Sequence, residues 1–152
     1  MDLVYGDLVR TRRALLGLSQ RALAARSGVA QPLIAAIESG RRRATPETRA
    51  ALEPELRLRP SDALGARRAQ VLDVLERAGA GDPVVFGSVA AGTDTPESDL
   101  DLIVTLPAGS GIIDLLALED ELEQLLTVHV DLVSAGSSGL DRLEGPRRPV
   151  AA

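Results

Sequence analysis

The spacing of apolar residues divides the chain into a helical first part and a second part that mixes strands with helices. In residues 1–60, apolar positions recur at helical spacing in several short segments. In residues 61–152, brief apolar runs at 83–86, 100–106 and 128–133 are typical of strands, and the last two alternate between apolar and polar positions. The pattern therefore predicts a helical bundle followed by a domain of strands and helices.

Four short helices are expected in the first part. The first contains an apolar stripe at helical spacing, made of Leu8, Leu15 and Leu16. Ser19 is a natural N-cap for the second helix, and Gly28 suits the left-handed turn that ends it. A third helix is expected over residues 31–39, and a fourth begins after Thr45 with proline in its first position. This order of short helices predicts a helix-turn-helix.

The second part begins after a helix stop at Pro60, with a new cap expected at Ser61 or Asp62. Helical spacing continues to about residue 79 and returns over 112–126, where four acidic residues are expected on an exposed face: Glu119, Asp120, Glu121 and Glu123. The last residues are rich in Gly, Ser, Pro and Ala. We therefore expect domains at 1–60 and 61–138 and a mobile tail at 139–152.

Charge separates the two parts in the same way. Residues 1–60 contain eleven Arg and six acidic residues, a net charge of +5, whereas residues 61–152 contain six Arg and sixteen acidic residues, a net charge of −10. The basic part suggests a polyanion as partner, and the acidic part suggests metal binding or simply solubility.

Several classes of protein are disfavoured by composition. The chain has no cysteine, so it has neither disulfides nor zinc-thiolate sites. Its N-terminus lacks a basic region followed by an apolar core, and no run of eighteen apolar residues occurs, so we expect a cytoplasmic protein that does not associate with membranes. Tyr5 and Phe86 are the only aromatic residues, so stacking platforms for single-stranded nucleic acid are not available.

The candidate chemistry lies around the strands of the second part. Asp99 and Asp101 are one residue apart at the start of the 100–106 run, so period-two geometry places both carboxylates on one face. Paired carboxylates repel each other and suit Mg²⁺ or Mn²⁺ together with substrate phosphates. Gly87 permits close approach of a phosphate, Ser88 offers its hydroxyl and amide, and Asp131 on the last strand could complete a cluster of three carboxylates. The alternative is a simple turn followed by solvated strand-edge aspartates.

These residues resemble the motif of the nucleotidyltransferases with the DNA polymerase beta fold, and within them the small minimal nucleotidyltransferases. The motif is Gly-Ser, a short helix, Asp-x-Asp and a lone Asp on a later strand, which maps onto Gly87, Ser88, Asp99, Asp101 and Asp131. The resemblance implies an α/β nucleotidyltransferase fold with a small mixed sheet, and so an α+β protein overall. It also implies transfer of a nucleoside monophosphate, most often AMP from ATP, to a hydroxyl acceptor. Catalysis and metal binding would then rest on the three aspartates, and nucleotide binding on Gly87 and Ser88.

The motif departs from the family pattern at two positions. Many members carry an Arg directly after the serine and another just before the next glycine, but here Val89 and Ala91 occupy these places. The loss removes cations that could hold a triphosphate, so metal ions and backbone amides must neutralise it.

The first part resembles the Xre or lambda-repressor-like DNA-binding family through Leu-Ser-Gln-x-x-Leu-Ala-x-x-Ser-Gly-Val-x-Gln followed by Ile-x-x-Ile-Glu-Ser-Gly-Arg. The resemblance implies that the 31–39 helix enters the major groove of an operator and that a homodimer reads two half-sites. The implied DNA contacts are Gln20, Arg21, Gln31, Arg41, Arg42 and Arg43. The recognition helix carries Leu33, Ala35 and Ala36 at positions that are usually polar, so thymine methyl contacts or shape would supplement direct base contacts. A helical protein-interaction domain is the alternative.

Two roles follow from combining the resemblances. Minimal nucleotidyltransferases of this size resemble antitoxins that modify or bind a small helical toxin of the HEPN ribonuclease class, and an operator-binding domain would let such a protein repress its own operon. The alternative is a transcriptional repressor whose inactive transferase fold serves as a nucleotide sensor or partner-docking surface. Val89 and Ala91 favour the alternative, whereas the three aspartates favour the enzyme.

Overall fold

The computed structural model describes residues 4–137 and 145–150 and has an α+β fold. The chain divides into two compact units. The first unit spans Asp2–Leu58, and the second spans Arg59–Ala152. In the described part of the chain, no helix combines the length and the apolar character that a membrane span requires.

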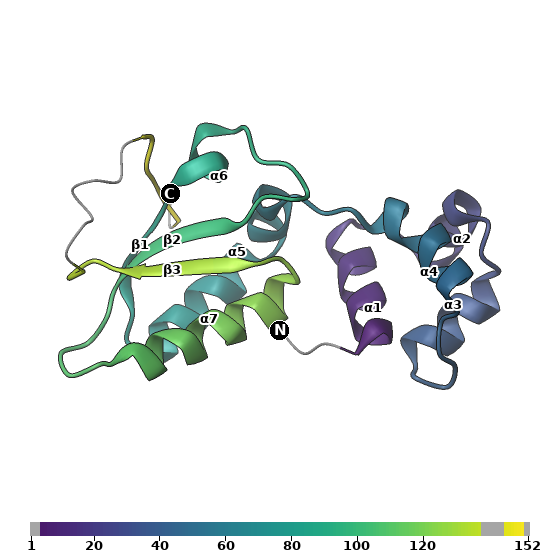
Figure 1. The fold of residues 1–152 in the computed structure, drawn as a ribbon, viewed down its shortest axis with the longest axis horizontal. Coiled ribbons are helices and arrows are strands. Elements are labelled where there is room, and N and C mark those ends of the chain that lie inside the picture. The colour runs from purple at the N-terminus through teal and green to yellow at the C-terminus, as the bar shows by residue number, and fades with distance from the viewer. Residues whose placement is uncertain (1–3, 138–144, 151–152) are drawn as a thin grey trace. The chain divides into compact units, whose positions relative to one another are not determined.

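The first unit is entirely helical (Figure 1). Ser19 caps its second helix as predicted, since its Oγ accepts a hydrogen bond of 3.0 Å from the Ala22 amide. Thr45 caps the fourth in the same way at 3.2 Å from Thr48, and Gly28 ends the second helix with a φ of 72°. The elements of this unit are α1 (Tyr5–Leu15), α2 (Gln20–Ser27), α3 (Gln31–Glu38), α4 (Pro46–Leu52) and the 3₁₀ helix η1 (Glu53–Leu56).

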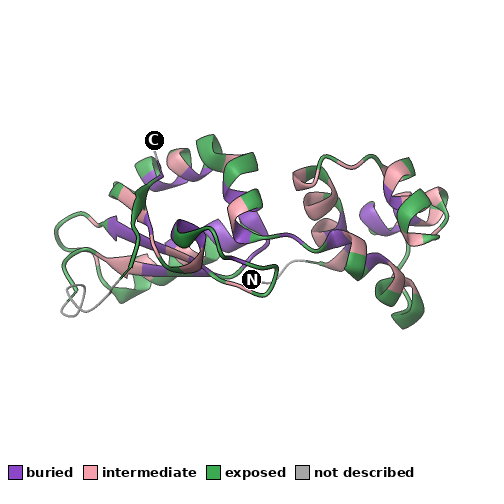
Figure 2. Ribbon diagram, turned by 90° about the horizontal axis from the view of Figure 1, so that it is seen from above, coloured by how far each residue is buried: buried purple, intermediate pink, exposed green. Residues whose placement is uncertain are grey.

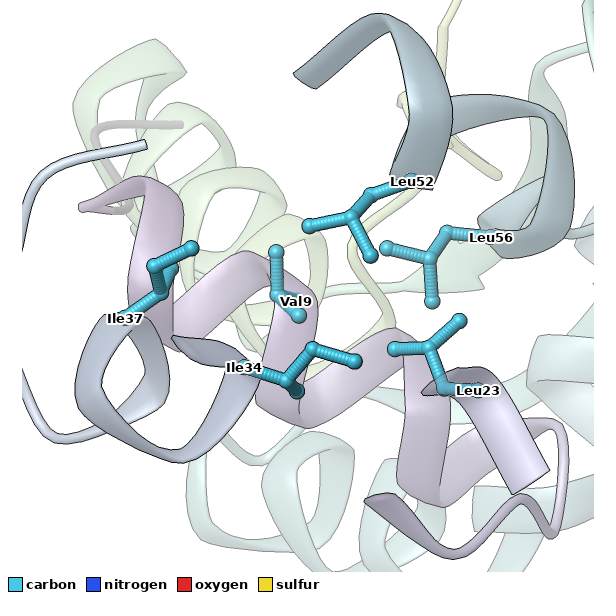
Figure 3. Packing of buried hydrophobic residues seen from close by; sticks show 6 residues of the cluster. All are labelled: Val9, Leu23, Ile34, Ile37, Leu52 and Leu56. Atoms are coloured by element: carbon cyan, nitrogen blue, oxygen red, sulfur yellow. The ribbon is translucent and has the colours of Figure 1, made fainter. Parts of the chain in front are cut away.

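The core of this unit is a cluster of six aliphatic side chains contributed by all five elements (Figure 3): Val9, Leu23, Ile34, Ile37, Leu52 and Leu56. The stripe expected on α1 was partly wrong, because Val9 is fully buried whereas Leu8 and Leu15 are only half-buried. Helical spacing identifies an apolar face but does not decide which of two neighbouring residues points into the core. Each fully buried side chain of this kind contributes about 1.5–3 kcal/mol.

Helices α1 and α3 approach each other closely at Gly6. A Cβ built on Gly6 would overlap the carbonyl oxygen of Ile37 and lie 3.1 Å from its carbonyl carbon. Glycine is therefore required here by the close approach of two backbones.

The second unit is built on a mixed four-stranded sheet, as the sequence predicted, in the order β3-β2-β1-β4. Strand β2 is antiparallel to β1 and parallel to β3, and β4 is antiparallel to β1. Helix α7 packs against β3 and α5, and the short helix α6 contacts β2. The elements are α5 (Pro60–Arg77), β1 (Gly81–Val85), α6 (Gly87–Ala91), β2 (Leu100–Thr105), α7 (Ile112–Leu126), β3 (Val130–Ser134) and β4 (Arg148–Pro149).

Strand β2 is central to the sheet, and most of its residues are buried (Figure 2). Leu100, Leu102 and Val104 are fully buried on one face, and Asp101 and Ile103 point to the other. The alternation predicted from the sequence is therefore confirmed, and it separates the apolar core from the face that bears the carboxylates.

The start of α5 differs from the prediction. Pro60 is the first residue of the helix rather than the end of a preceding one, and neither Ser61 nor Asp62 is its N-cap. The Ser61 amide instead donates a 2.9 Å hydrogen bond to Oδ2 of the buried Asp94, in the connection between α6 and β2. Local sequence could not reveal this cap, because it comes from a distant part of the chain.

The acidic residues of α7 do not all form a solvent-exposed face, which corrects the sequence prediction. Glu123 is 6% exposed, and its Oε1 accepts a 3.1 Å hydrogen bond from the Val130 amide. Glu119 Oε2 accepts a 3.2 Å bond from the Leu132 amide. Both amides lie on β3, which forms one edge of the sheet, so the two carboxylates satisfy backbone donors that have no strand partner there.

A mobile tail was expected over 139–152. Of this tail, residues 139–144 and 151–152 lie outside the described residues. Within 145–150, β4 pairs with β1. Val150 is 2% exposed, and its amide donates a 2.9 Å hydrogen bond to the Pro83 carbonyl oxygen.

Candidate functional site

Two of the predicted site residues lie directly opposite each other on neighbouring strands. Asp101 on β2 and Asp131 on β3 are register partners in the parallel pair. Parallel partners point their side chains to the same face, and adjacent strands lie about 4.8 Å apart. The sheet therefore brings these two carboxylates together on the face opposite the Leu102 core.

Asp99 lies just before β2 and is exposed. A turn precedes it, in which the Thr95 amide donates to Ser98 Oγ and the Ser98 amide donates to the Thr95 carbonyl, both at 3.0 Å. The next amide, that of Leu100, bonds to the His129 carbonyl at 2.9 Å. The backbone at Asp99 is thus held on both sides, next to the start of β3.

Gly87 connects this carboxylate group to α6. Its φ is 64°, a conformation that glycine adopts without strain, and a Cβ built there would overlap Asp101 Oδ2. The preceding Phe86 amide donates a 3.1 Å hydrogen bond to the Asp101 carbonyl oxygen. Ser88 follows in the first turn of α6 and is half-buried. The structure therefore brings Gly87, Ser88 and the predicted aspartates to one region.

Electrostatics at this site disfavour an isolated cluster of negative charges. Partial burial raises the pKa of Asp101, and the charges of Asp131 and then Asp99 raise it further. Among the residues that the structure describes, no three Asp, Glu or His side chains are already gathered closely enough to hold a metal ion. Asp101 and Asp131 share one face and Asp99 lies just before β2, but the three side chains are not arranged as a closed coordination shell.

One residue near the site was not included by the sequence prediction. His129 Nε2 lies 3.8 Å from Asp131 Oδ1, and its Nδ1 contacts Glu123 Oε1. Burial would lower the pKa of His129, but the hydrogen bond with Glu123 and the charges of Glu123, Asp99 and Asp131 raise it overall. The signal in the sequence was the alternation that places residues 129 and 131 on one face, although a lone histidine on a strand is usually structural.

The helix-turn-helix unit contains a second polar arrangement, centred on Glu38 at the end of α3. Glu38 is 6% exposed and accepts hydrogen bonds from Arg13 Nε at 2.6 Å and Arg13 Nη2 at 2.9 Å. Gln20 Nε2 donates a third bond at 2.8 Å. Burial alone would raise the pKa of Glu38, but these hydrogen bonds and the positive charge of Arg13 lower it below the ordinary value.

Gln20 and Gln31, two of the predicted DNA contacts, are bonded to each other. Gln31 Nε2 donates a 2.8 Å hydrogen bond to Gln20 Oε1, while the Gln20 amide nitrogen is bonded to Glu38. A continuous chain of hydrogen bonds therefore runs from Arg13 through Glu38 and Gln20 to Gln31, at the first residue of α3. This chain fixes the orientation of the Gln31 side chain.

The four arginines predicted to contact DNA are all exposed. Arg21 lies in the first turn of α2, and the other three follow α3: Arg41, Arg42 and Arg43. Arg41 Nε donates a 2.9 Å hydrogen bond to Ser39 Oγ, and the Arg42 amide bonds to the Ala36 carbonyl at 3.1 Å. The backbone of this basic segment is therefore fixed relative to the end of α3.

Comparison with known proteins gives matches for both units. A family model described as a nucleotidyltransferase domain matches residues 68–148, and one described as helix-turn-helix matches residues 9–53. A protein of Methanocaldococcus jannaschii, provisionally named a protein adenylyltransferase, is 30% identical over 70 residues, which are 46% of this chain and 75% of that protein.

Two solved structures are also similar. One, provisionally described as a minimal nucleotidyltransferase, is 43% identical and has a TM-score of 0.48, with coverage of 54% of this chain and 85% of that chain. The other, described as a toxin-antitoxin with AMP-PNP, is 22% identical and has a TM-score of 0.49, with coverage of 55% and 71%.

Proposed function

The chain belongs to the nucleotidyltransferase domain family and carries a helix-turn-helix domain before it, and from this we propose that it is a DNA-binding nucleotidyltransferase. The proposed reaction transfers AMP from ATP to a hydroxyl acceptor. The observation that carries the proposal is the placement of Asp101 opposite Asp131, beside a glycine whose missing side chain leaves room for the Asp101 carboxylate. The name of the archaeal relative supports adenylyl transfer as the reaction.

The donor set at this site fits a hard divalent cation. Asp99, Asp101 and Asp131 offer only carboxylate oxygens, which Mg²⁺ and Mn²⁺ prefer. Partial burial raises the pKa of Asp101, and repulsion from Asp131 and Asp99, which a cation would relieve, raises it further. Because the three side chains are not yet gathered, binding requires them to turn toward one another. Bound Mg²⁺ or Mn²⁺ would neutralise charge on the triphosphate and on the attacking oxygen.

The remaining steps are assigned to residues of the chain. The backbone at Gly87 and the amide and hydroxyl of Ser88 bind the β and γ phosphates. Asp131 accepts the proton of the acceptor hydroxyl, whose oxygen then forms a bond to the α phosphorus while the bond to pyrophosphate breaks. Asp131 is suited to this role because its side chain is 54% exposed and so is open to an acceptor that docks from outside.

For the first unit we propose binding to a double-stranded operator, with α3 in the major groove and Gln31 reaching a base edge. Gln20 serves as the link that holds Gln31, since both ends of its amide are engaged within the protein. Exposed Arg21 and the arginines at 41–43 contact phosphates, which supply affinity rather than sequence choice. A homodimer would place two recognition helices on two half-sites.

We further propose an antitoxin role, in which the acceptor is a small helical toxin of the HEPN class and the first unit represses the shared operon. Support comes from the resemblance in sequence and from the combination of the two domains. Co-expression of a HEPN-type toxin gene adjacent to this one should give a toxin that is heavier by one AMP. An unmodified toxin that remains active would remove the toxin from the list of acceptors.

A second candidate function has its own supporting observation. Val89 and Ala91 leave the turn of α6 without the arginines that many family members use on a triphosphate. A repressor with an inactive transferase fold would need no such cations, and would use the fold as a nucleotide sensor or docking surface. Such a protein would bind ATP or a partner but release no pyrophosphate.

The experiment that separates these functions follows pyrophosphate release and protein-bound label from α-labelled ATP with Mg²⁺ or Mn²⁺. We expect activity in the wild type and loss of it in Asp99→Asn/Asp101→Asn. Asp73→Asn, an exposed residue on α5, is the matched control and should keep full activity. Equal turnover in the wild type and the double variant would exclude the carboxylates as the site, and no turnover in any sample would favour the repressor.

A further inference from the structure

A separate cavity of about 430 Å³ opens on the second unit, between the first half of α5 and the edge strand β4. Its volume lies within the range of about 300–1,000 Å³ that is typical of small-molecule sites. We propose that this cavity binds a small organic anion that joins a phosphate or carboxylate group to an apolar body.

None of the predicted site residues lines the cavity, although Val89, which does, directly follows Ser88 in α6. Val85, which lines it, is the register partner of Leu102 on one side and of Arg148 on the other. Side chains of paired residues point to the same face of a sheet, and Leu102 points to the face opposite Asp101. Arg148 and Val85 therefore lie on the core face, and the cavity is distinct from the proposed nucleotide site.

The base of the cavity is apolar. Leu64 on α5, Val85 on β1, Val89 on α6 and Val150 after β4 all line it, and each is at most 9% exposed. Such a surface favours a ligand with an apolar portion, because contact with it removes apolar area from water.

Two cationic side chains line the cavity. They are Arg68 on α5 and Arg148 on β4, and no acidic side chain lines it among the residues that the structure describes. Both arginines are exposed, and Arg68 follows Arg67, whose non-helical φ and ψ of −123° and 24° bend α5 beside the cavity. Residues 61–152 have a net charge of −10, so two guanidinium groups at one cavity form a local site for an anion in an otherwise acidic region. The guanidinium group of Arg forms paired hydrogen bonds with phosphate or carboxylate.

Gly65 provides the means to close the cavity without disturbing the fold. It lines the cavity from within α5, and a Cβ built on it would meet no atom within 4 Å. A larger side chain at this position would extend into the open space rather than into a neighbouring residue. Gly65→Leu should therefore occupy the cavity, and the helix should tolerate it because leucine is a better helix former than glycine.

The test uses 8-anilinonaphthalene-1-sulfonate, a fluorescent probe with an apolar aromatic body and one anionic group, on the full chain. The chain has no tryptophan, so protein emission does not interfere with the probe. We expect one saturable site in the wild type, with affinity at least about tenfold weaker in Gly65→Leu and in Arg148→Gln. Circular dichroism establishes that both variants are folded.

Two controls make the result specific. Arg77→Gln removes the same charge outside the cavity, and Ile113→Gln removes an exposed apolar side chain on α7 that could bind the probe by itself. Both should bind like the wild type. N-phenyl-1-naphthylamine, which has the same apolar body without the sulfonate, should bind more weakly and should respond to Gly65→Leu but not to Arg148→Gln.

Competition identifies the anionic group, since hexyl phosphate and heptanoate carry the same hexyl chain and differ in their charged ends. Displacement of the probe by either one supports the site and assigns its preference. Probe binding that survives Gly65→Leu in a folded protein, or that is lost in Ile113→Gln, would overturn the proposal. Equal affinity for the neutral and anionic probes would overturn the role of the arginines.

Discussion

Replacing Glu38 by glutamine should destabilise the helix-turn-helix unit by about 2–3 kcal/mol. The Glu38 carboxylate is 6% exposed and accepts three hydrogen bonds, two of them from Arg13. Removing one partner of a buried ion pair costs about 3–5 kcal/mol, and the 17% exposure of the Arg13 side chain lowers this value through partial solvation. A unit of this size has a total stability of only about 3–9 kcal/mol, so the loss is a large fraction of it.

The same interaction makes stability depend on pH. The pKa of Glu38 is lower in the folded state than the ordinary value of about 4.3. Its stabilisation is therefore complete above that ordinary pKa and is lost as pH falls through the lower, folded-state pKa. The wild-type unit should weaken in acid below about pH 4.3, and Glu38→Gln should lack this part of the pH dependence.

Tyr5 allows the unit to be followed in the full chain. It is the only tyrosine, no tryptophan is present, and its ring lies in the first unit with the Arg49 guanidinium 4.2 Å from the ring centroid. Urea unfolding monitored by tyrosine fluorescence at pH 7 and pH 3.5 measures both effects. Equal unfolding midpoints for the wild type and Glu38→Gln at pH 7 would refute the reasoning.

Three further predictions follow from individual positions. Gly6→Ala should destabilise the first unit by about 1–3 kcal/mol in the same fluorescence assay, because its Cβ would overlap the Ile37 carbonyl oxygen; Gly65→Ala, with open space around its Cβ, should leave that transition unchanged. Gly87→Ala should reduce AMP transfer at least about tenfold, since its Cβ would displace the Asp101 carboxylate; undiminished transfer would separate Gly87 from the site. In electrophoretic mobility assays, Arg42→Gln should weaken binding to all DNA sequences and lower the slope of log affinity against log salt concentration by about 1. Gln31→Ala should instead change the sequence preference. An unchanged salt slope in Arg42→Gln would argue against the phosphate contact.

Much of the fold could be predicted because its signals are local. Ser19 and Thr45 cap their helices through amides three residues away, so a short window contains both partners. The alternation around Asp101 likewise fixes which side chains share a face, and the paired register of β2 and β3 then places Asp131 beside it.

The features that the sequence did not reveal depend on distant partners. Asp94 caps α5 from a connection more than thirty residues later, and Glu123 is buried because it accepts a hydrogen bond from the edge strand β3. The composition of β4 gives no strand signal, and β4 is a strand because it pairs with β1. The contact of His129 with Glu123 belongs to the same category, since it follows from how α7 packs on β3, whereas its proximity to Asp131 follows from the local alternation.

The central claim is that the aspartate face carries out nucleotidyl transfer, and comparing two labels of ATP tests it most directly. Purified protein is incubated with lysate of its own organism, Mg²⁺ and ATP labelled at either the α or the γ phosphate. The account predicts that the α label alone becomes attached to an acceptor and that Asp101→Asn abolishes the transfer. Attachment of the γ label, or α labelling that persists in the variant, would contradict it.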